Sequence, residues 1–252
     1  LFVPLQIVYL SPFLVPVWIA GIRRLWRDPE LRWARPMVVA YPLLCVMVVA
    51  SGGKSYYALP LLLVLTAAGC EPLARRARGR GRTAVLVGGG VLAAITSGLA
   101  SLPLLPTGAL SAVNGINAEQ GEQVGWPALT SAVAARWSAI PPAERAHAVI
   151  FTENYGEHGA ITRFGPRHGL PTPYSAHMSD ADWGPPPDSA TGPVVLVYQD
   201  GDRSIGRFFT GCRPGSRVDT GVDDQEQGAH VDLCTGTTGP WSAIWPRLRH
   251  YY

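Results

Sequence analysis

Four apolar stretches crowd the first 110 residues, and they constrain the fold more than any other feature. A helix that crosses a bilayer needs about 20 apolar residues, with about 17–25 tolerated. The stretches run from about Leu1 to Ile22, Met37 to Ser51, Tyr56 to Gly69 and Ala84 to Leu105. The first and fourth meet the required length, whereas the middle two, of about 15 residues each, need their flanks to complete a crossing or must sit partly re-entrant. We therefore expect about four membrane-spanning helices in preference to buried helices of a soluble core.

Basic residues fill alternate connections between these stretches. The first connection carries Arg23, Arg24, Arg27, Arg32 and Arg35, and the third carries Arg75, Arg76, Arg78, Arg80 and Arg82. The second connection, Ser51 to Ser55, carries Lys54 alone. Short cytoplasmic loops are enriched in Lys and Arg. The pattern thus predicts a plasma-membrane protein, with the first and third connections inside and everything after about Leu105 outside the cytoplasm.

The net charge of +3 hides two unlike regions. Residues 1–110 hold eleven basic and three acidic residues, a net charge of +8, and residues 111–252 hold ten and fifteen, a net charge of −5. Hydrophobic residues make up 47% of the chain, which excludes disorder because such a chain can bury ample apolar surface. The basic excess belongs to the membrane region, so no nucleic-acid partner is expected. We predict two domains: transmembrane helices over 1–110 and an extracytoplasmic α/β domain over 111–252.

The first apolar stretch does not resemble a cleaved signal peptide. It has no initiating Met and no basic segment before it, and Pro4, Pro12 and Pro16 interrupt it. Membrane helices tolerate such prolines, because neighbouring groups satisfy the freed backbone. We expect the chain to be the C-terminal part of a longer polytopic protein.

Lys54, with Tyr56 and Tyr57 beside it, is the first candidate site. A lone ammonium at the outer end of a helix pair can hold a lipid phosphate as a point charge. The alternative is a lysine that extends its charge to the membrane surface within an interfacial belt of aromatic residues. Spacing alone leaves both open.

From Asn114 onward the pattern changes to that of a small α/β domain. Helical periodicity predicts helices over Trp126–Ile140, Asn154–Phe164, Asp202–Phe209 and Trp241–Leu248. Short apolar runs predict strands over Ala146–Phe151 and Pro193–Tyr198, and near Ser216–Val218 and His230–Leu233.

The cysteines fit an extracytoplasmic compartment. Cys212 and Cys234 lie in the outer region, where an oxidising environment permits a disulfide bond that would link the last two strands. Cys45 and Cys70 belong to the apolar stretches and are expected to be inert packing residues. Metal binding is the rival for the outer pair, but no His lies at ligand spacing. Neither a metal site nor a cofactor is expected.

Four residues after the strand Ala146–Phe151 form a second candidate site. Ligands of open α/β sheets bind beyond the carboxyl ends of strands, and Glu153, Asn154, Tyr155 and Glu157 follow such an end. Glu153 and Glu157 lie about one helical turn apart and could share a face. The alternative is that these residues cap the following helix and stabilise its dipole.

His177 and Trp183 belong to a third candidate. The segments Tyr174-Ser175-Ala176-His177 and Trp183-Gly184-Pro185-Pro186-Pro187 offer a polar and aromatic surface suited to stacking on a sugar. A well-packed loop would have the same composition. No serine-hydrolase elbow, Walker loop or glycosidase carboxylate pair is recognisable.

These residues also resemble a known family. Gly53-Lys54-Ser55-Tyr56-Tyr57-Ala58-Leu59-Pro60-Leu61 resembles the Lys-x-x-Tyr-x-Leu-Pro signature in late spans of family 39 glycosyltransferases, which are similar to protein O-mannosyltransferases and bacterial aminoarabinose transferases. The segments that resemble the C-terminal domain of actinobacterial members are Phe151-Thr152-Glu153-Asn154-Tyr155-Gly156-Glu157, Trp183-Gly184-Pro185-Pro186-Pro187, Gly221-Val222-Asp223-Asp224-Gln225-Glu226-Gln227-Gly228 and Pro240-Trp241-Ser242-Ala243-Ile244-Trp245-Pro246-Arg247-Leu248-Arg249-His250-Tyr251.

The resemblance implies a GT-C type transferase that moves a sugar from a polyprenyl-phosphate donor to an extracytoplasmic glycan, lipid or protein acceptor. Family members take their catalytic base from an acidic residue in the first extracytoplasmic loop, and nothing in this chain matches that loop. Lys54 corresponds to the family's lysine and would face the lipid phosphate. The competing interpretation is a non-enzymatic, membrane-anchored module whose outer domain binds a glycan or a partner protein.

Overall fold

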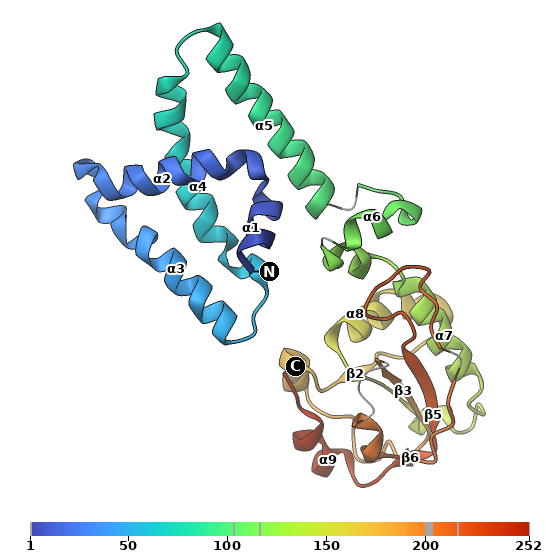
Figure 1. Cartoon of the computed structure of the whole chain (residues 1–252). Helices are drawn as coiled ribbons and strands as arrows, with labels where there is room; N and C mark the ends of the chain where they lie inside the picture. The colour runs from blue at the N-terminus through green and yellow to red at the C-terminus, as the bar shows by residue number, and fades with distance from the viewer. Residues whose placement is uncertain (1, 103, 116, 200–203, 216, 252) are drawn as a thin grey trace. The chain divides into compact units, whose positions relative to one another are not determined.

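The computed structural model describes residues 2–102, 104–115, 117–199, 204–215 and 217–251 (Figure 1). The chain forms two compact units. We call Leu1–Pro106 with Gly115–Asn117 the helical unit, and Thr107–Asn114 with Ala118–Tyr252 the α/β unit.

The helical unit contains three helical stretches long and apolar enough to cross a membrane within the described residues. They are Pro29–Ala50, Ser55–Arg76 and Arg80–Ser101, of 22 residues each. In the first two, a 3₁₀ turn (Pro29–Ala34 or Ser55–Ala58) precedes the α-helix α3 (Arg35–Ala50) or α4 (Leu59–Arg76), and the third is α5 (Arg80–Ser101). The flanks therefore complete the two apolar stretches that were too short by themselves.

The first apolar stretch is broken into two helices within the described residues, so the structure has three candidate spans, or four if this bent pair counts as one. Helix α1 (Phe2–Leu10) and helix α2 (Val15–Arg27) are separated by a 3₁₀ turn, and the pair is bent by 91°. The break lies at Ser11, whose φ is 79° and whose hydroxyl accepts a hydrogen bond from the Phe13 amide. Pro12 has no amide hydrogen to continue the helical ladder. The pair is either a broken span or a re-entrant segment.

Helices α2 and α4 cross through two glycines. A Cβ atom added at Gly21 would lie 1.7 Å from the carbonyl oxygen of Leu65, and one added at Gly69 would lie 1.8 Å from that of Val17. Small residues at such a contact let helix backbones approach closely. Any side chain at either glycine would prevent this crossing.

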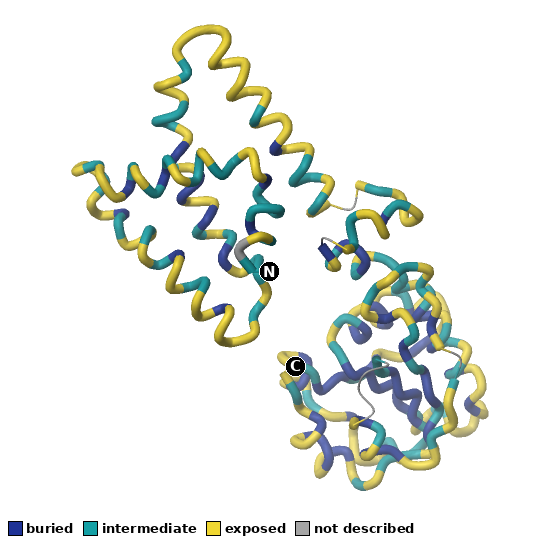
Figure 2. Tube along the Cα trace, in the orientation of Figure 1, coloured by how far each residue is buried: buried dark blue, intermediate teal, exposed yellow. Residues whose placement is uncertain are grey.

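Most apolar surface of the three long helices faces away from the protein (Figure 2). Only 17%, 28% and 6% of the most apolar windows of Pro29–Ala50, Ser55–Arg76 and Arg80–Ser101 are buried inside the protein. Their length and composition suggest a multi-pass membrane protein, because lipid is the solvent that matches such a surface.

The α/β unit is built on a small mixed sheet with strand order β2-β1-β3-β5. The strands are β1 (Val149–Thr152), β2 (Tyr174–Ser175), β3 (Val194–Tyr198) and β5 (His230–Cys234). Strand β1 is parallel to β2 and β3, whereas β5 is antiparallel to β3. Strands β4 (Phe209–Thr210) and β6 (Gly236–Thr237) pair separately. The parallel strands therefore end at one edge of the sheet.

Alternate residues of the central strands face two separate cores. Ile150, Val195 and Val197 pack in one core with helices α7 (Trp126–Ser138) and α8 (Tyr155–Phe164). Val149, Phe151, Val194 and Leu196 pack in the other with helix α9 (Trp241–Leu248). The result is a three-layer α/β/α arrangement, which explains why β3 reads as a continuous apolar run.

Most predicted elements of this unit are confirmed, with two differences. The helix expected over Asp202–Phe209 is a 3₁₀ turn over Ile205–Phe208, and residues 202–203 lie outside the described part. No strand forms at Arg217 or Val218, and Ser216 lies outside the described residues. Val218 instead exchanges backbone hydrogen bonds with the turn at Gly228 and Ala229. A local apolar residue cannot by itself specify a strand without a neighbouring ladder.

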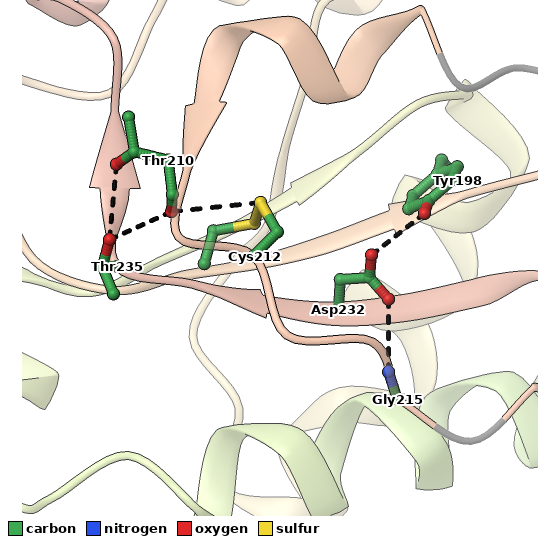
Figure 3. Close-up of a disulfide and its surroundings, with 7 residues drawn as sticks. Tyr198, Thr210, Cys212, Gly215, Asp232 and Thr235 are labelled. Atoms are coloured by element: carbon green, nitrogen blue, oxygen red, sulfur yellow. Dashed lines mark hydrogen bonds between the residues drawn. A yellow bond between two sulfur atoms is a disulfide. The ribbon is translucent and has the colours of Figure 1, made fainter.

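Cys212 and Cys234 form a disulfide bond (Figure 3). Cys212 follows β4 and Cys234 ends β5, so the bond joins β5 to the segment after β4 rather than to the expected strand. Beside it, Asp232 accepts hydrogen bonds from the Tyr198 hydroxyl (2.9 Å) and the Gly215 amide (3.2 Å). Cys45 and Cys70 are free thiols.

Candidate functional site

The Lys54 segment lies at the start of the helical stretch Ser55–Arg76. Lys54 is the extended residue that precedes the 3₁₀ turn Ser55–Ala58, and its carbonyl accepts a hydrogen bond from the Tyr57 amide. Lys54 and Tyr57 are exposed, and the rings of Tyr56 and Tyr57 meet edge to face at 5.0 Å. The structure therefore keeps this basic and aromatic group together at a helix end.

A buried glutamine holds the start of the stretch Ser55–Arg76 in position. Gln6 in α1 is fully buried, and its Nε2 donates a hydrogen bond of 3.2 Å to the carbonyl of Ser55. The hydroxyl of Tyr41 in α3 donates to the Gln6 Oε1. Helices α1 and α3 thus hold the backbone next to Lys54, although the sequence analysis did not single out Gln6 or Tyr41. The sequence signal that could have identified Gln6 is its polar side chain within an apolar stretch. A polar group in the interior of a membrane is costly unless it is paired.

Asn154 and Glu157 form a capping box at the start of α8. The Asn154 Oδ1 accepts a hydrogen bond from the Glu157 amide at 2.8 Å, and the Glu157 Oε2 accepts one from the Asn154 amide at 3.2 Å. This arrangement satisfies amides that a helix start leaves without partners. The capping alternative is therefore confirmed for these two residues. Tyr155 is the first residue of α8 and is exposed.

Glu153 precedes α8 and does not lie on its face. It is buried, and its Oε2 accepts a hydrogen bond of 2.6 Å from the Gln199 amide, which follows β3. Glu153 thus joins the carboxyl ends of two parallel strands. The predicted shared helical face with Glu157 does not exist, because the chain is still extended at Asn154.

Buried carboxyl groups gather around the capping box. Burial raises the pKa of Glu157 well above its usual range, and the nearby carboxyl groups of Glu153 and Glu226 raise it further. Burial, followed by the charges of Glu122 and Asp224, raises the pKa of Glu226 to about 8. Desolvation disfavours the ionised form of an acid. The environment of Glu157 and Glu226 therefore favours their neutral forms more than solvent would.

His177 lies between two rings at the same edge of the sheet. Its imidazole stacks on Tyr155 at 5.0 Å and on His250 at 4.7 Å, and its Nδ1 accepts a hydrogen bond from the Tyr155 amide. Burial and the neighbouring His250 lower the pKa of His177. The structure thus brings His177 to the start of α8, beside the second candidate site.

A pocket of about 770 Å³ lies beside this edge. Its lining side chains come from α8, from β2 and the segments next to it, and from the turn before Gly184. Trp183 is 76% exposed at its rim, and neither His177 nor the capping residues line it. The third candidate therefore divides into two places: a half-buried histidine stack and an open pocket with an indole.

A close contact between a histidine and an aspartate lies next to the indole. The His158 Nδ1 lies 2.8 Å from the Asp180 Oδ2, and both side chains are about nine-tenths buried. The His158 ring in turn contacts the Trp183 ring, with a centroid distance of 5.3 Å. The sequence analysis did not single out His158. The missed signal is the spacing of His158 and Thr162, which are four residues apart on one face of α8 and both line the pocket.

Among the described residues, no group of three or more His, Cys, Asp or Glu side chains is arranged to hold a metal ion. The acidic residues around Glu157 share hydrogen bonds with one another and with the backbone instead.

Models of known protein families, curated proteins and solved structures were compared with this chain, and none of them matches it.

Proposed function

We propose that this chain is the C-terminal part of an integral-membrane glycosyltransferase. The enzyme would transfer a sugar from a polyprenyl-phosphate donor to an acceptor outside the cytoplasm. The proposal rests on the family resemblance of the Lys54 segment and of the α/β unit. It is supported by the apolar helices, which would hold the chain in a lipid bilayer where such a donor is dissolved.

One observation carries the role of Lys54. The helical stretch Ser55–Arg76 has Lys54 immediately before its first residue and Arg75 and Arg76 at its last turn. A 22-residue helix is about 33 Å long, so the two basic groups lie on opposite sides of a membrane if this helix spans it. Because the arginine-rich ends are expected inside, Lys54 would meet the outer headgroup layer, where a lipid-linked donor presents its phosphate.

The chemistry of the segment suits a lipid phosphate. An ammonium binds phosphate as a compact point charge, and the Tyr56 and Tyr57 rings suit the boundary between headgroups and acyl chains. The contacts of Gln6 with Ser55 and Tyr41 would keep the segment in position. This chain supplies donor binding, while the base that activates the acceptor is expected in segments upstream.

Binding of polyprenyl monophosphate to the purified chain in detergent tests this role. Lys54→Ala should raise the Kd at least about tenfold, because a hydrogen bond to a charged group contributes about 1.5–3 kcal/mol. Lys54→Arg should keep most of the affinity. Arg78→Ala, a charge removed from the opposite connection, is the matched control. Native mass spectrometry reads the bound fraction, and equal affinity of Lys54→Ala and the unaltered chain would refute the phosphate role.

The competing function is a membrane-anchored module that binds a glycan or a partner protein. The open pocket beside Trp183 favours a glycan over a protein for this alternative. The reading frame upstream of Leu1 separates the two functions: further spans with an acidic first outer loop support the transferase, and a start codon near Leu1 contradicts it.

A further inference from the structure

The pocket beside Trp183 combines an exposed indole with two positively charged side chains. Trp183, Arg163 and Arg167 all line its volume of about 770 Å³. A volume of this size suits a small-molecule ligand, since such sites typically measure about 300–1,000 Å³. The lining residues belong entirely to the α/β unit.

The indole is held in place although it is 76% exposed. Gly184 follows it with a φ of 89°, and the Gly184 amide donates to the Ala181 carbonyl at 3.3 Å, which closes the turn. His158 contacts one side of the ring, and its own position is fixed by Asp180. A large, supported aromatic face open to solvent does not stabilise a core. It offers a flat apolar surface to a ligand.

The charges in the pocket favour an anion. Arg163 and Arg167 are exposed on α8 and the turn after it, and the guanidinium of Arg167 lies 5.6 Å from the centre of the Phe164 ring. Asp180 is the single carboxylate among the lining residues, and it is paired with His158. The two guanidinium groups therefore outnumber the acid. Guanidinium groups bind phosphate and carboxylate with paired hydrogen bonds.

Hydroxyl groups complete the lining. Thr162, Thr172 and Ser175 border the same pocket. Short hydroxyl side chains can both donate and accept hydrogen bonds, so they match a ligand that is itself rich in hydroxyl groups. A flat apolar face, hydroxyls and positive charge together describe a sugar ring that carries an anionic group.

We propose that this pocket binds an anionic saccharide, with its pyranose ring against Trp183 and its phosphate or carboxylate on Arg163 and Arg167. The site is separate from the Lys54 segment and takes no part in holding the lipid donor. It would serve a transferase and a binding module equally, so it stands whichever of the two functions is correct.

Saturation-transfer NMR and calorimetry on the full chain in detergent test the proposal. The probes are glucose 6-phosphate, glucuronic acid, glucose, inorganic phosphate and adenosine monophosphate. We expect at least one of the two anionic sugars to bind at least about tenfold more tightly than glucose and than phosphate. The affinities of glucose 6-phosphate and glucuronic acid, compared with each other, distinguish a phosphate ligand from a carboxylate ligand. Binding should weaken with added salt, because the guanidinium groups are exposed.

Variants locate the site. Trp183→Ala, and separately the double variant Arg163→Gln with Arg167→Gln, should each weaken binding at least about tenfold. Trp33→Ala removes an indole that is equally exposed, at 76%, and Arg213→Gln removes an exposed guanidinium outside the pocket. Both controls should bind normally. Because all five positions are exposed, the variants should fold.

Four results would overturn the proposal. These are no binding of either anionic sugar, equal binding of glucose, binding of phosphate alone as tight as that of the sugars, and tighter binding of adenosine monophosphate. Loss of binding in either control variant would also overturn it, since the ligand would then lie elsewhere. Failure of Lys54→Ala to affect the lipid phosphate would leave these outcomes unchanged, so the two proposals fail independently.

Discussion

The two units use the same apolar residues in opposite ways. In the α/β unit, Val194, Val195 and Val197 of strand β3 are completely buried. In the helical unit, Val85 and Val87 of α5 are 74% and 61% exposed. The difference is plain in Figure 2, where the strands are dark blue and α5 is mostly yellow. Apolar side chains favour the environment that excludes water, so one unit provides that environment internally and the other takes it from outside.

The units also differ in the polar groups that they bury. The helical unit buries neutral groups, such as Gln6 with its partners Tyr41 and Ser55. The α/β unit buries carboxyl groups, among them Glu157 and Glu226, whose pKa values are raised. A neutral amide does not titrate, whereas a buried acid couples folding to protons. The comparison therefore predicts that the stabilities of the two units respond differently to a bulky residue at a helix crossing, to the shortening of an apolar side chain, and to pH.

The largest effect should come from the helix crossing. Gly21→Val would force a side chain against the Leu65 carbonyl, and no rotamer avoids a Cβ clash with backbone. We expect α2 and α4 to separate, at a cost above about 3 kcal/mol. Peptide-resolved hydrogen exchange in detergent should show loss of protection in α2 and α4 while the α/β unit stays protected. Gly88→Val is the control, because a Cβ at Gly88 has open space around it. Normal protection in Gly21→Val would disprove the crossing.

A matched pair of leucines tests the opposite use of apolar residues. Leu196 is 1% exposed in the α/β core, and Leu43 is 58% exposed on α3. Leu196→Ala should destabilise the α/β unit by about 3 kcal/mol, since it removes buried methyl groups and leaves a cavity. Leu43→Ala in detergent should change stability by less than about 1 kcal/mol, because detergent replaces the lost contact. Thermal unfolding followed by circular dichroism measures both. Equal losses would mean that Leu43 packs against protein.

The third expected effect is a dependence of the stability of the α/β unit on pH. The pKa of Glu226 rises from the usual 4.5 to about 8 on folding, so the folded state holds an extra proton between these values. The contribution of Glu226 to stability should be greatest below about pH 4.5. It should fall as the pH rises from 4.5 to about 8. The slope for one group is at most about 1.4 kcal/mol per pH unit, and partial solvent screening reduces it.

Chemical denaturation between pH 5 and pH 8 measures this slope. Glu226→Gln keeps a neutral side chain of the same size, so it should flatten the decline of the α/β unit and leave the helical unit unchanged. Glu144→Gln, at an exposed position, should leave the slope as it is. A variant at Glu226 with the slope of the unaltered chain would show that its carboxyl is ionised throughout.

Sequence reasoning succeeded where the controlling interactions are local. The helices near Trp126 and Trp241 and the strand at Val194 follow from periodicity, and the capping box at Asn154 follows from residue types three positions apart. It noted that prolines interrupt the first apolar stretch, but it did not locate the sharp bend at Ser11. Hydropathy counts apolar residues but does not register the turn that Pro12 imposes.

The candidate sites also divide into groupings that the local sequence predicts and groupings that it does not. Lys54, Tyr56 and Tyr57 are adjacent in sequence, so their grouping was predictable. The pocket was not: Trp183 lies 25 residues after His158 in the chain, and their contact exists only because β2 and the turn before Gly184 fold back on α8. Nothing in the sequence indicated that His177 lies at a strand edge, and its stacking on His250 required the C-terminal segment to return to the sheet.

By itself, the sequence determined that this protein has an apolar, arginine-bordered half and a separate α/β half, because apolar length, charge and period are properties of consecutive residues. Only the tertiary structure decided which apolar residues are buried, that Gly21 and Gly69 form a crossing, that Cys212 and Cys234 are bonded, and which polar residues share a pocket. These depend on contacts between residues far apart in the chain, and such contacts form only when the elements pack.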